Sequence, residues 1–166
     1  MPKTIKKELN TNDNLKKILH YCAYQERCWA EVRNKMNEMN LSTSEKDTFL
    51  YYLNENNYVN EHRYSSAIVR GKFNQKKWGR LKIQFELRAK QIPETIIKQA
   101  FEEDITTQAY EQTIEQLYHQ KINECPHATA IVRKDKAIKY ILSKGFEYPI
   151  IESVIKNIGN PQLRLY

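Results

Sequence analysis

The stretch LNENNYVNEHRYSSAIVRGK, Leu53 to Lys72, decides how the rest of the chain is interpreted. It holds four asparagines within seven residues and then becomes amphipathic and basic. A helix that ends on a left-handed residue brings the following residue back onto its last turn, and asparagine tolerates that conformation better than most residues. With Asn57 in this place, Tyr58 meets Leu53, so the spacing predicts a helix end at Asn57.

The same stretch contains the signals of a second helix immediately afterwards. Asn60 is a good N-cap, and Glu61 suits the positive end of a helix dipole. Val59 and Tyr64 have the spacing of a hydrophobic staple across a helix start. We therefore expect a tight corner between two helices. The alternative, a flexible polar linker, would leave the placement of the apolar residues unexplained.

The same stop signal recurs along the chain in MNEMNL, LRAKQI and ILSKGF, with Asn40, Gln91 and Gly145 as the left-handed residues. Gln91 is the poorest of these, so we expect strain or a different cap there. The first pattern shifts by 51 residues onto the second, and the second by 54 onto the third. A period near 50 residues indicates a tandem-repeat protein.

Each repeat has room for three helices, so the expected fold is all-α, with three tandem three-helix repeats in an elongated, curved molecule. The nine expected helices cover 14–26, 29–38, 44–56, 60–73, 77–90, 93–104, 107–123, 127–144 and 148–157. Ser42 with Glu45 forms a possible capping box, and Pro93 and Pro149 fit first turns. The expected units are a disordered or loosely ordered segment 1–13, repeats 14–58, 59–105 and 106–158, and a tail 159–166.

The composition of the 166 residues agrees with a helical protein, because there are only 4 Gly and 5 Pro. We find no apolar run that could span a bilayer and no apolar core of a secretory signal. Cys22, Cys28 and Cys125 lack scaffold spacing, which favours buried, reduced thiols in a cytoplasmic protein. The four histidines show no metal-binding spacing, and no glycine-rich phosphate loop is present. We therefore expect no enzyme activity, metal or cofactor.

The positive charge is concentrated in the middle of the chain. The net charge of +7 favours polyanionic partners. Nine cationic side chains and one acid lie between Arg63 and Lys90, whereas the segment Glu94 to Glu124 holds seven acids and two lysines. The candidate binding residues are Arg70, Lys72, Lys76, Lys77, Arg80, Lys82, Arg88 and Lys90, with a second cluster of Arg133, Lys134 and Lys136.

These cations could contact nucleic-acid phosphates or acidic patches on a protein. The alternative without a function in binding is a solvated helix face that contacts no partner. Trp78 and Phe73 could stack on bases, although a tryptophan beside a glycine at a helix start is more often part of a core. Arg63 could pair with an acid on a neighbouring helix or contact a partner, and Tyr64 is expected in the core.

The middle of the chain resembles the central repeat of the RecX family, regulators of the RecA recombinase. Asn60, Glu61, Arg63 and Tyr64 match a family corner of paired Asn/Asp and Glu/Asp residues followed by Arg-Phe/Tyr-Ala, with Ser65 replacing the alanine. Further matches are Trp78-Gly79, Ile83, Leu87 and the stop KQI, where Gln91 replaces the usual glycine. The run YCAYQERCWAEVRNKM is similar to the family's first helix pair, with Cys28 replacing a serine cap, and ILSKGF resembles the third repeat's stop.

The resemblance implies a non-enzymatic modulator, mainly an inhibitor, that binds the RecA nucleoprotein filament. It would act on filament growth, ATP hydrolysis and strand exchange, in DNA repair, homologous recombination and the SOS response. Single-stranded DNA would be contacted through the filament by a cytoplasmic monomer. The alternative is a sequence-indifferent nucleic-acid-binding helical-repeat protein acting without RecA. A tetratricopeptide-type scaffold is disfavoured, because its period is about 34 residues.

Overall fold

The computed structural model describes residues 12–124 and 126–159, and within these residues the chain forms helices and no strands. The first three helices are α2 (Asp13–Tyr24), α3 (Trp29–Glu38) and α4 (Thr43–Glu55). The next three are α5 (Glu61–Lys76), α6 (Arg80–Ala89) and α7 (Glu94–Asp104). The last three are α8 (Thr107–Asn123), α9 (Ala130–Ser143) and α10 (Tyr148–Gly159). Each expected helix is present with ends shifted by at most three residues, which confirms the all-α repeat fold.

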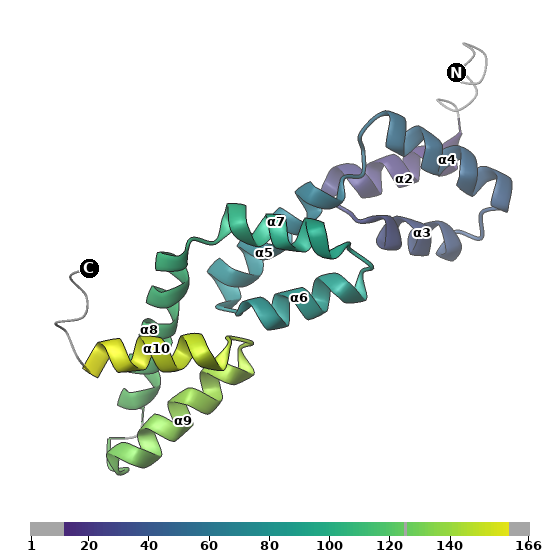
Figure 1. Cartoon of the computed structure of the whole chain (residues 1–166). Coiled ribbons are helices and arrows are strands. Elements are labelled where there is room, and N and C mark those ends of the chain that lie inside the picture. Colours follow the sequence, from purple (N-terminus) through teal and green to yellow (C-terminus); the bar gives the residue numbers. More distant parts are fainter. Residues whose placement is uncertain (1–11, 125, 160–166) are drawn as a thin grey trace.

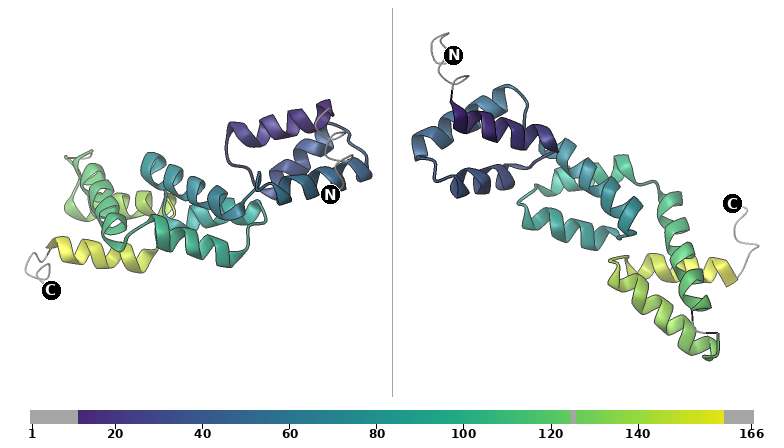
Figure 2. Two further views of the ribbon diagram at one scale, coloured as in Figure 1. Left: turned by 90° about the horizontal axis from the view of Figure 1, so that it is seen from above. Right: turned by 180° about the vertical axis from the view of Figure 1, so that it is seen from behind.

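The three triplets follow one another along an elongated, bent molecule (Figures 1 and 2). The triplet α2–α4 lies at one end, α5–α7 in the middle, and α8–α10 at the other end. The division into units at 58/59 and 105/106 stays a prediction. Of the expected end segments, residues 1–11 and 160–166 lie outside the described residues, while Asp13 opens α2 and Gly159 closes α10.

Four helix ends use the same left-handed stop, as the repeated pattern predicted. Asn40, Asn57, Gln91 and Gly145 have φ values of 53°, 52°, 62° and 89°. At each stop the next residue donates its backbone N–H to the carbonyl five residues earlier, as Tyr58 does to Leu53 at 2.9 Å. Gln91 therefore adopts the same cap as the others, not a different one. Its left-handed backbone carries a strain of about 1 kcal/mol relative to glycine.

A fifth positive φ, which the sequence pattern did not predict, occurs at Lys77. Its φ is 52°, and the following residue, Trp78, donates its N–H to the carbonyl of Lys72, six residues back. This wider turn ends α5 at Lys76. It sends the chain directly to Gly79, where α6 starts without any side-chain cap.

Helix starts also follow the sequence. Ser42 and Glu45 form the expected capping box, and the side chain of Asn60 accepts the N–H of Arg63 at 2.9 Å. Pro149 lies in the first turn of α10, as expected, whereas Pro93 is the N-cap of α7 and not part of its first turn. The difference at Pro93 is one residue, and its carbonyl still accepts the first helical hydrogen bonds.

The corner at Asn57 is an ordered helix end, but the predicted staple is not formed. Val59 and Tyr64 are both buried, at 5% and 4% exposure, yet they belong to two different hydrophobic clusters. Val59 completes the core of the first triplet, whereas Tyr64 faces the core of the second. The corner thus sits on the boundary between two cores, which a pattern of neighbouring residues cannot reveal.

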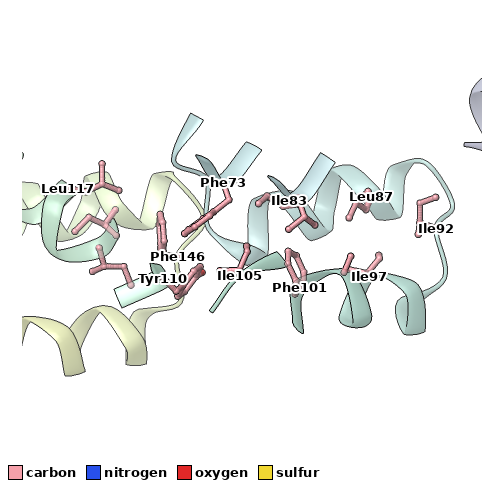
Figure 3. Close-up of a cluster of buried hydrophobic side chains, with 14 of the residues drawn as sticks. Phe73, Ile83, Leu87, Ile92, Ile97, Phe101, Ile105, Tyr110, Leu117 and Phe146 are labelled. Carbon is pink, nitrogen blue, oxygen red and sulfur yellow. The ribbon is translucent and has the colours of Figure 1, made fainter. Parts of the chain in front are cut away.

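The hydrophobic interior consists of two clusters. The first triplet has its own, built around Leu15, Val32, Phe49 and Leu53. The second and third triplets share one continuous cluster, in which Phe73 stacks on Tyr110 and Tyr110 packs at a tilt against Phe146 where the two triplets meet (Figure 3). Cys28 is the residue of the first triplet that belongs to this larger cluster.

Cys22 and Cys28 are buried free thiols, as expected, and Cys125 lies outside the described residues. Burial raises the pKa of the Cys22 thiol to about 11. Such a thiol is protonated and unreactive near neutral pH.

Candidate binding surface

Four of the predicted cations of the middle triplet are neutralised within the protein. Arg70 contacts Asp104 at 2.9 Å and Lys90 contacts Glu31 at 3.1 Å. The other two pairs are Lys72 with Glu86 and Arg88 with Glu94. Three of these four acids lie outside the basic segment in sequence, so the segment's formal charge overstates the positive charge that it presents to a partner.

Two more lysines of the set gather, with Lys72, around one aromatic ring. The ammonium groups of Lys82, Lys72 and Lys76 lie 4.6, 4.7 and 5.5 Å from the centroid of the Trp78 indole. Trp78 is half-buried and packs against the large hydrophobic cluster. Cations over an indole face are attracted by the ring quadrupole. We name Trp78, Lys72, Lys76 and Lys82 the Trp78 cluster.

The Trp78 cluster lies where the second triplet meets the third. The backbone N–H groups of Gly79 and Leu81, at the start of α6, donate to the carbonyls of Lys144 and Gly145 at 2.8 and 3.0 Å. The stop of α9 therefore satisfies two N–H groups that a helix start leaves unpaired. A Cβ atom at Gly79 would overlap the backbone of Gly145 and Phe146, so the approach requires glycine.

Tyr110 of α8 also contacts the start of α6. Its hydroxyl donates to Glu147 and accepts the backbone N–H of Arg80 at 2.9 Å. The Arg80 guanidinium lies 4.3 Å from the centroid of its ring. Burial, reinforced by the bond to Glu147, raises the pKa of Tyr110, so it stays a protonated hydrogen-bonding residue. No motif in the sequence singled out Tyr110, although it is the fourth residue of α8, as Tyr64 is of α5.

The predicted corner residues hold the first triplet against the second. Arg63 donates to the carboxylate of Glu26 and to the carbonyl of Asn57, both at 3.0 Å, which supports its structural role. Tyr64 is buried and its hydroxyl lies 3.2 Å from Glu31. Burial raises the pKa of Tyr64 and also that of Glu61 at the helix start.

The structure also separates the two aromatic candidates. Phe73 is 4% exposed and stacks on Tyr110, so the expectation that it could stack on bases is wrong. Phe73 lies on the side of α5 that faces the core, an orientation that the sequence pattern did not decide. Trp78 keeps part of its surface accessible.

The second predicted cluster does not join the Trp78 cluster. Arg133, Lys134 and Lys136 lie on α9 at seven or more residues before its end, roughly 10–15 Å along the helix axis. Lys134 and Lys136 are exposed, and Arg133 is half-buried with an Nε that has no hydrogen-bond partner among the described residues. Lys77 and Arg80 lie on either side of Trp78 in sequence; Lys77 is the C-cap of α5, and Arg80 covers Tyr110.

Within the described ranges, no group of three His, Cys, Asp or Glu side chains is placed to hold a metal ion. In the same ranges, no helix has the length and apolar character needed to cross a membrane.

Comparison with known proteins identifies the repeat. Residues 60–100 match the family described as RecX, second three-helix domain. The chain is 26% identical over 143 residues to the regulatory protein RecX of Halalkalibacterium halodurans, covering 84% of this chain and 52% of the relative. It is 27% identical over 149 residues to the regulatory protein RecX of Lactococcus lactis subsp. lactis, covering 84% and 53%. The chain thus spans about half the length of these two relatives.

Solved structures show the same fold. The crystal structure of RecX from Lactobacillus salivarius aligns with a TM-score of 0.80 at 23% identity, over 87% of this chain and 94% of that one. A second crystal structure, of regulatory protein RecX, aligns with a TM-score of 0.75 at 21% identity, over 94% and 80%. The middle triplet thus matches the second three-helix domain of the RecX family, most of the chain is similar in sequence to regulatory proteins named RecX, and its fold is that of the solved RecX structures.

Proposed function

We propose that this chain is a non-enzymatic regulator, mainly an inhibitor, of the RecA recombinase and binds the RecA–DNA nucleoprotein filament. It modulates filament growth, ATP hydrolysis and strand exchange. The observation that carries the proposal is the RecX-type series of three triplets with a basic middle unit. The related proteins are named regulatory proteins, which supports regulation over catalysis.

The elongated shape supports a polymeric target. Three triplets in series present contacts along a line, so the molecule can touch more than one subunit of a filament at once. A second contact made by an already bound molecule is intramolecular, which strengthens binding to the assembled polymer over free subunits. Such a regulator acts at a low ratio to RecA.

ATP hydrolysis by RecA on single-stranded DNA tests the proposal. Addition of this protein at substoichiometric ratio is expected to lower the rate of hydrolysis, and the protein alone is expected to hydrolyse no ATP. A variant with Lys76, Lys77 and Arg80 changed to Glu is expected to lose most of the effect. Unchanged hydrolysis at every ratio of the unaltered protein would reject the proposal.

The matched control reverses three other lysines, Lys16, Lys17 and Lys98, which are exposed on α2 and α7. It changes the net charge by the same amount but leaves the middle surface intact, so it should still act on RecA. Because Arg80 covers Tyr110, the far-ultraviolet circular dichroism and thermal midpoint of both variants must match the parent.

A second function, binding of nucleic acid without RecA, is favoured by the partly exposed Trp78 beside lysines. Aromatic rings and cations together bind single strands with little sequence preference. Tight binding to bare single-stranded DNA that falls steeply with salt, with no change in RecA hydrolysis, would favour this function over the first.

A further inference from the structure

The two joints between neighbouring triplets are built from equivalent positions but carry different charges. The repeat offset of 51 residues places Lys82 where the first unit has Glu31, and the offset of 54 places Lys144 where the second unit has Lys90. In the first joint, Glu31 near the start of α3 faces Lys90 at the end of α6. In the second joint, Lys82 near the start of α6 faces the end of α9. The first joint therefore combines an acid with a lysine, and the second combines two lysines.

The first joint is closed by its own side chains. The ammonium of Lys90 lies 3.1 Å from the Glu31 carboxylate. Tyr64 donates to the same carboxylate at 3.2 Å, and Arg27 lies 3.8 Å from its other oxygen. The Glu31 side chain is 16% exposed, so this pairing is largely shielded from water. This joint therefore has a carboxylate of its own between its cations.

The second joint has the opposite character. Lys82 reaches across to the carbonyl of Ser143, and Lys144 reaches back to the carbonyl of Lys76, each over a long 3.4 Å. Lys82 also lies over Trp78, Lys144 lies 5.4 Å from the Tyr140 ring centroid, and the ammonium of Lys76 is nearby. Among the described residues, no carboxylate pairs with Lys76, Lys82 or Lys144; the neighbouring Glu86 is engaged by Lys72.

Helix ends alone do not account for this arrangement. A lysine near a helix C-terminus is favourable by about 0.3–1 kcal/mol at an exposed site, which explains each contact separately. It does not explain three ammonium groups around one joint with no carboxylate paired to any of them, since like charges repel. An anion between them would remove that repulsion.

We infer that the joint between the second and third triplets binds a phosphate group, which takes the place that Glu31 holds in the first joint. A phosphate has enough oxygens to accept hydrogen bonds from several ammonium groups at once. The contacts come from α5, α6 and the end of α9, so a bound phosphate stiffens the angle between the two triplets. The inference deepens the proposed function, on which the assignment of nucleic acid as the phosphate source rests.

The test uses Trp78 as its reporter. The chain has 2 tryptophans, so Trp29→Phe leaves Trp78 as the sole one. Two probes are titrated separately, inorganic tripolyphosphate and a short single-stranded oligothymidylate, while Trp78 fluorescence and the thermal midpoint are recorded. Both probes are expected to give a saturable fluorescence change and to raise the midpoint. The oligothymidylate binds more tightly if a base also stacks on Trp78.

Lys82→Glu is the decisive variant, because it copies the first joint. The new carboxylate pairs with Lys144, so the thermal midpoint without ligand should rise. Affinity for both probes should fall by at least ~10-fold, since an attractive contact becomes a repulsive one. Lys98→Glu on α7 makes the same charge change away from the joint and should bind like the parent. If Lys82→Glu misfolds, Lys144→Ala, which removes one cation without the new pair, should also lower the affinity for both probes, by a smaller factor.

Three results would overturn the inference: no fluorescence response to either probe, unchanged affinity in Lys82→Glu and Lys144→Ala, or an equal response to polyglutamate. The last result would assign the joint to acidic protein surfaces. Failure here is separable from failure of the proposed function. The parent protein would then still lower RecA-driven ATP hydrolysis, whereas a failed proposal would leave hydrolysis unchanged even if phosphate binds.

Discussion

The two glycines of the middle triplet should respond in opposite directions to the same substitution. Gly71 lies inside α5, and a Cβ atom there would have no heavy atom within 4 Å. Gly79 is the N-cap of α6, and a Cβ atom there would overlap the backbone of the stop at Gly145. Alanine should therefore stabilise the protein at Gly71 and destabilise it at Gly79.

The magnitudes follow from helix propensity and from packing. Gly71→Ala should raise the free energy of unfolding by about 1 kcal/mol, the difference in helix propensity. At Gly79, overpacking costs about 1–3 kcal/mol. If α6 moves away, the hydrogen bonds from Gly79 and Leu81 are weakened at about 1 kcal/mol each. We expect Gly79→Ala to lower the free energy of unfolding by about 2–4 kcal/mol.

Urea denaturation followed by circular dichroism measures both effects. Gly71→Ala should raise the midpoint with an unchanged slope. Gly79→Ala should lower the midpoint, and the slope should also fall if the third triplet unfolds before the second. If Gly79→Ala were as stable as Gly71→Ala, this result would refute the close packing of the start of α6 against the end of α9.

Three further predictions concern single contacts. Gln91→Gly should raise the free energy of unfolding by about 1 kcal/mol, because glycine adopts the left-handed φ of 62° without strain; thermal denaturation would show no gain if the cap were relaxed. A double-mutant cycle of Arg63→Ala and Glu26→Ala should give a coupling of about 0.5 kcal/mol, since both side chains are over a third exposed, at 38% and 35%; zero coupling would contradict the pairing. Burial raises the pKa of the Cys22 thiol from 9.0 to about 11, so the protonated thiol favours the folded state and that contribution is lost as pH rises between these values. Urea titrations should show the stability advantage over Cys22→Ala shrinking across this range, and a constant difference would oppose it.

The helices could be predicted from the sequence because their ends are specified locally. The left-handed stops at Asn40, Asn57 and Gly145 need only an apolar pair five residues apart and a tolerant residue between them. Even the unfavourable Gln91 keeps this geometry, because Leu87 and Ile92 are both buried and hold the turn in place. Lys77 had no such signal. Its turn is wider, and the nearby Lys76 and Gly79 contact Lys144 of the third triplet.

The binding surface was harder to predict, because charge pairing depends on residues far apart in the chain. Arg70 meets Asp104 and Lys90 meets Glu31, partners that a count over a local segment cannot assign. Tyr110 supports the second joint from α8, and no spacing between neighbouring residues indicates that it lies under Arg80. The sequence therefore indicates which segment is rich in cations. Only the tertiary fold shows which of these cations pair with acids of the protein.

The two joints also differ in what holds them, and this bears on how the molecule can lie along a polymer. In a repeat protein each unit contacts its neighbours, so the joints set the overall curvature. The second joint is continuous in its apolar packing, with the rings of Phe73, Tyr110 and Phe146 in contact across it. At the first joint, the buried side chains of the first triplet other than Cys28 form a separate cluster, and the ion pairs of Glu31 and Arg63 cross the joint. Salt screens the more exposed pair of Arg63 and Glu26 more than it screens the largely buried Glu31 carboxylate or apolar packing, so we expect the second and third triplets to form the stiffer arm.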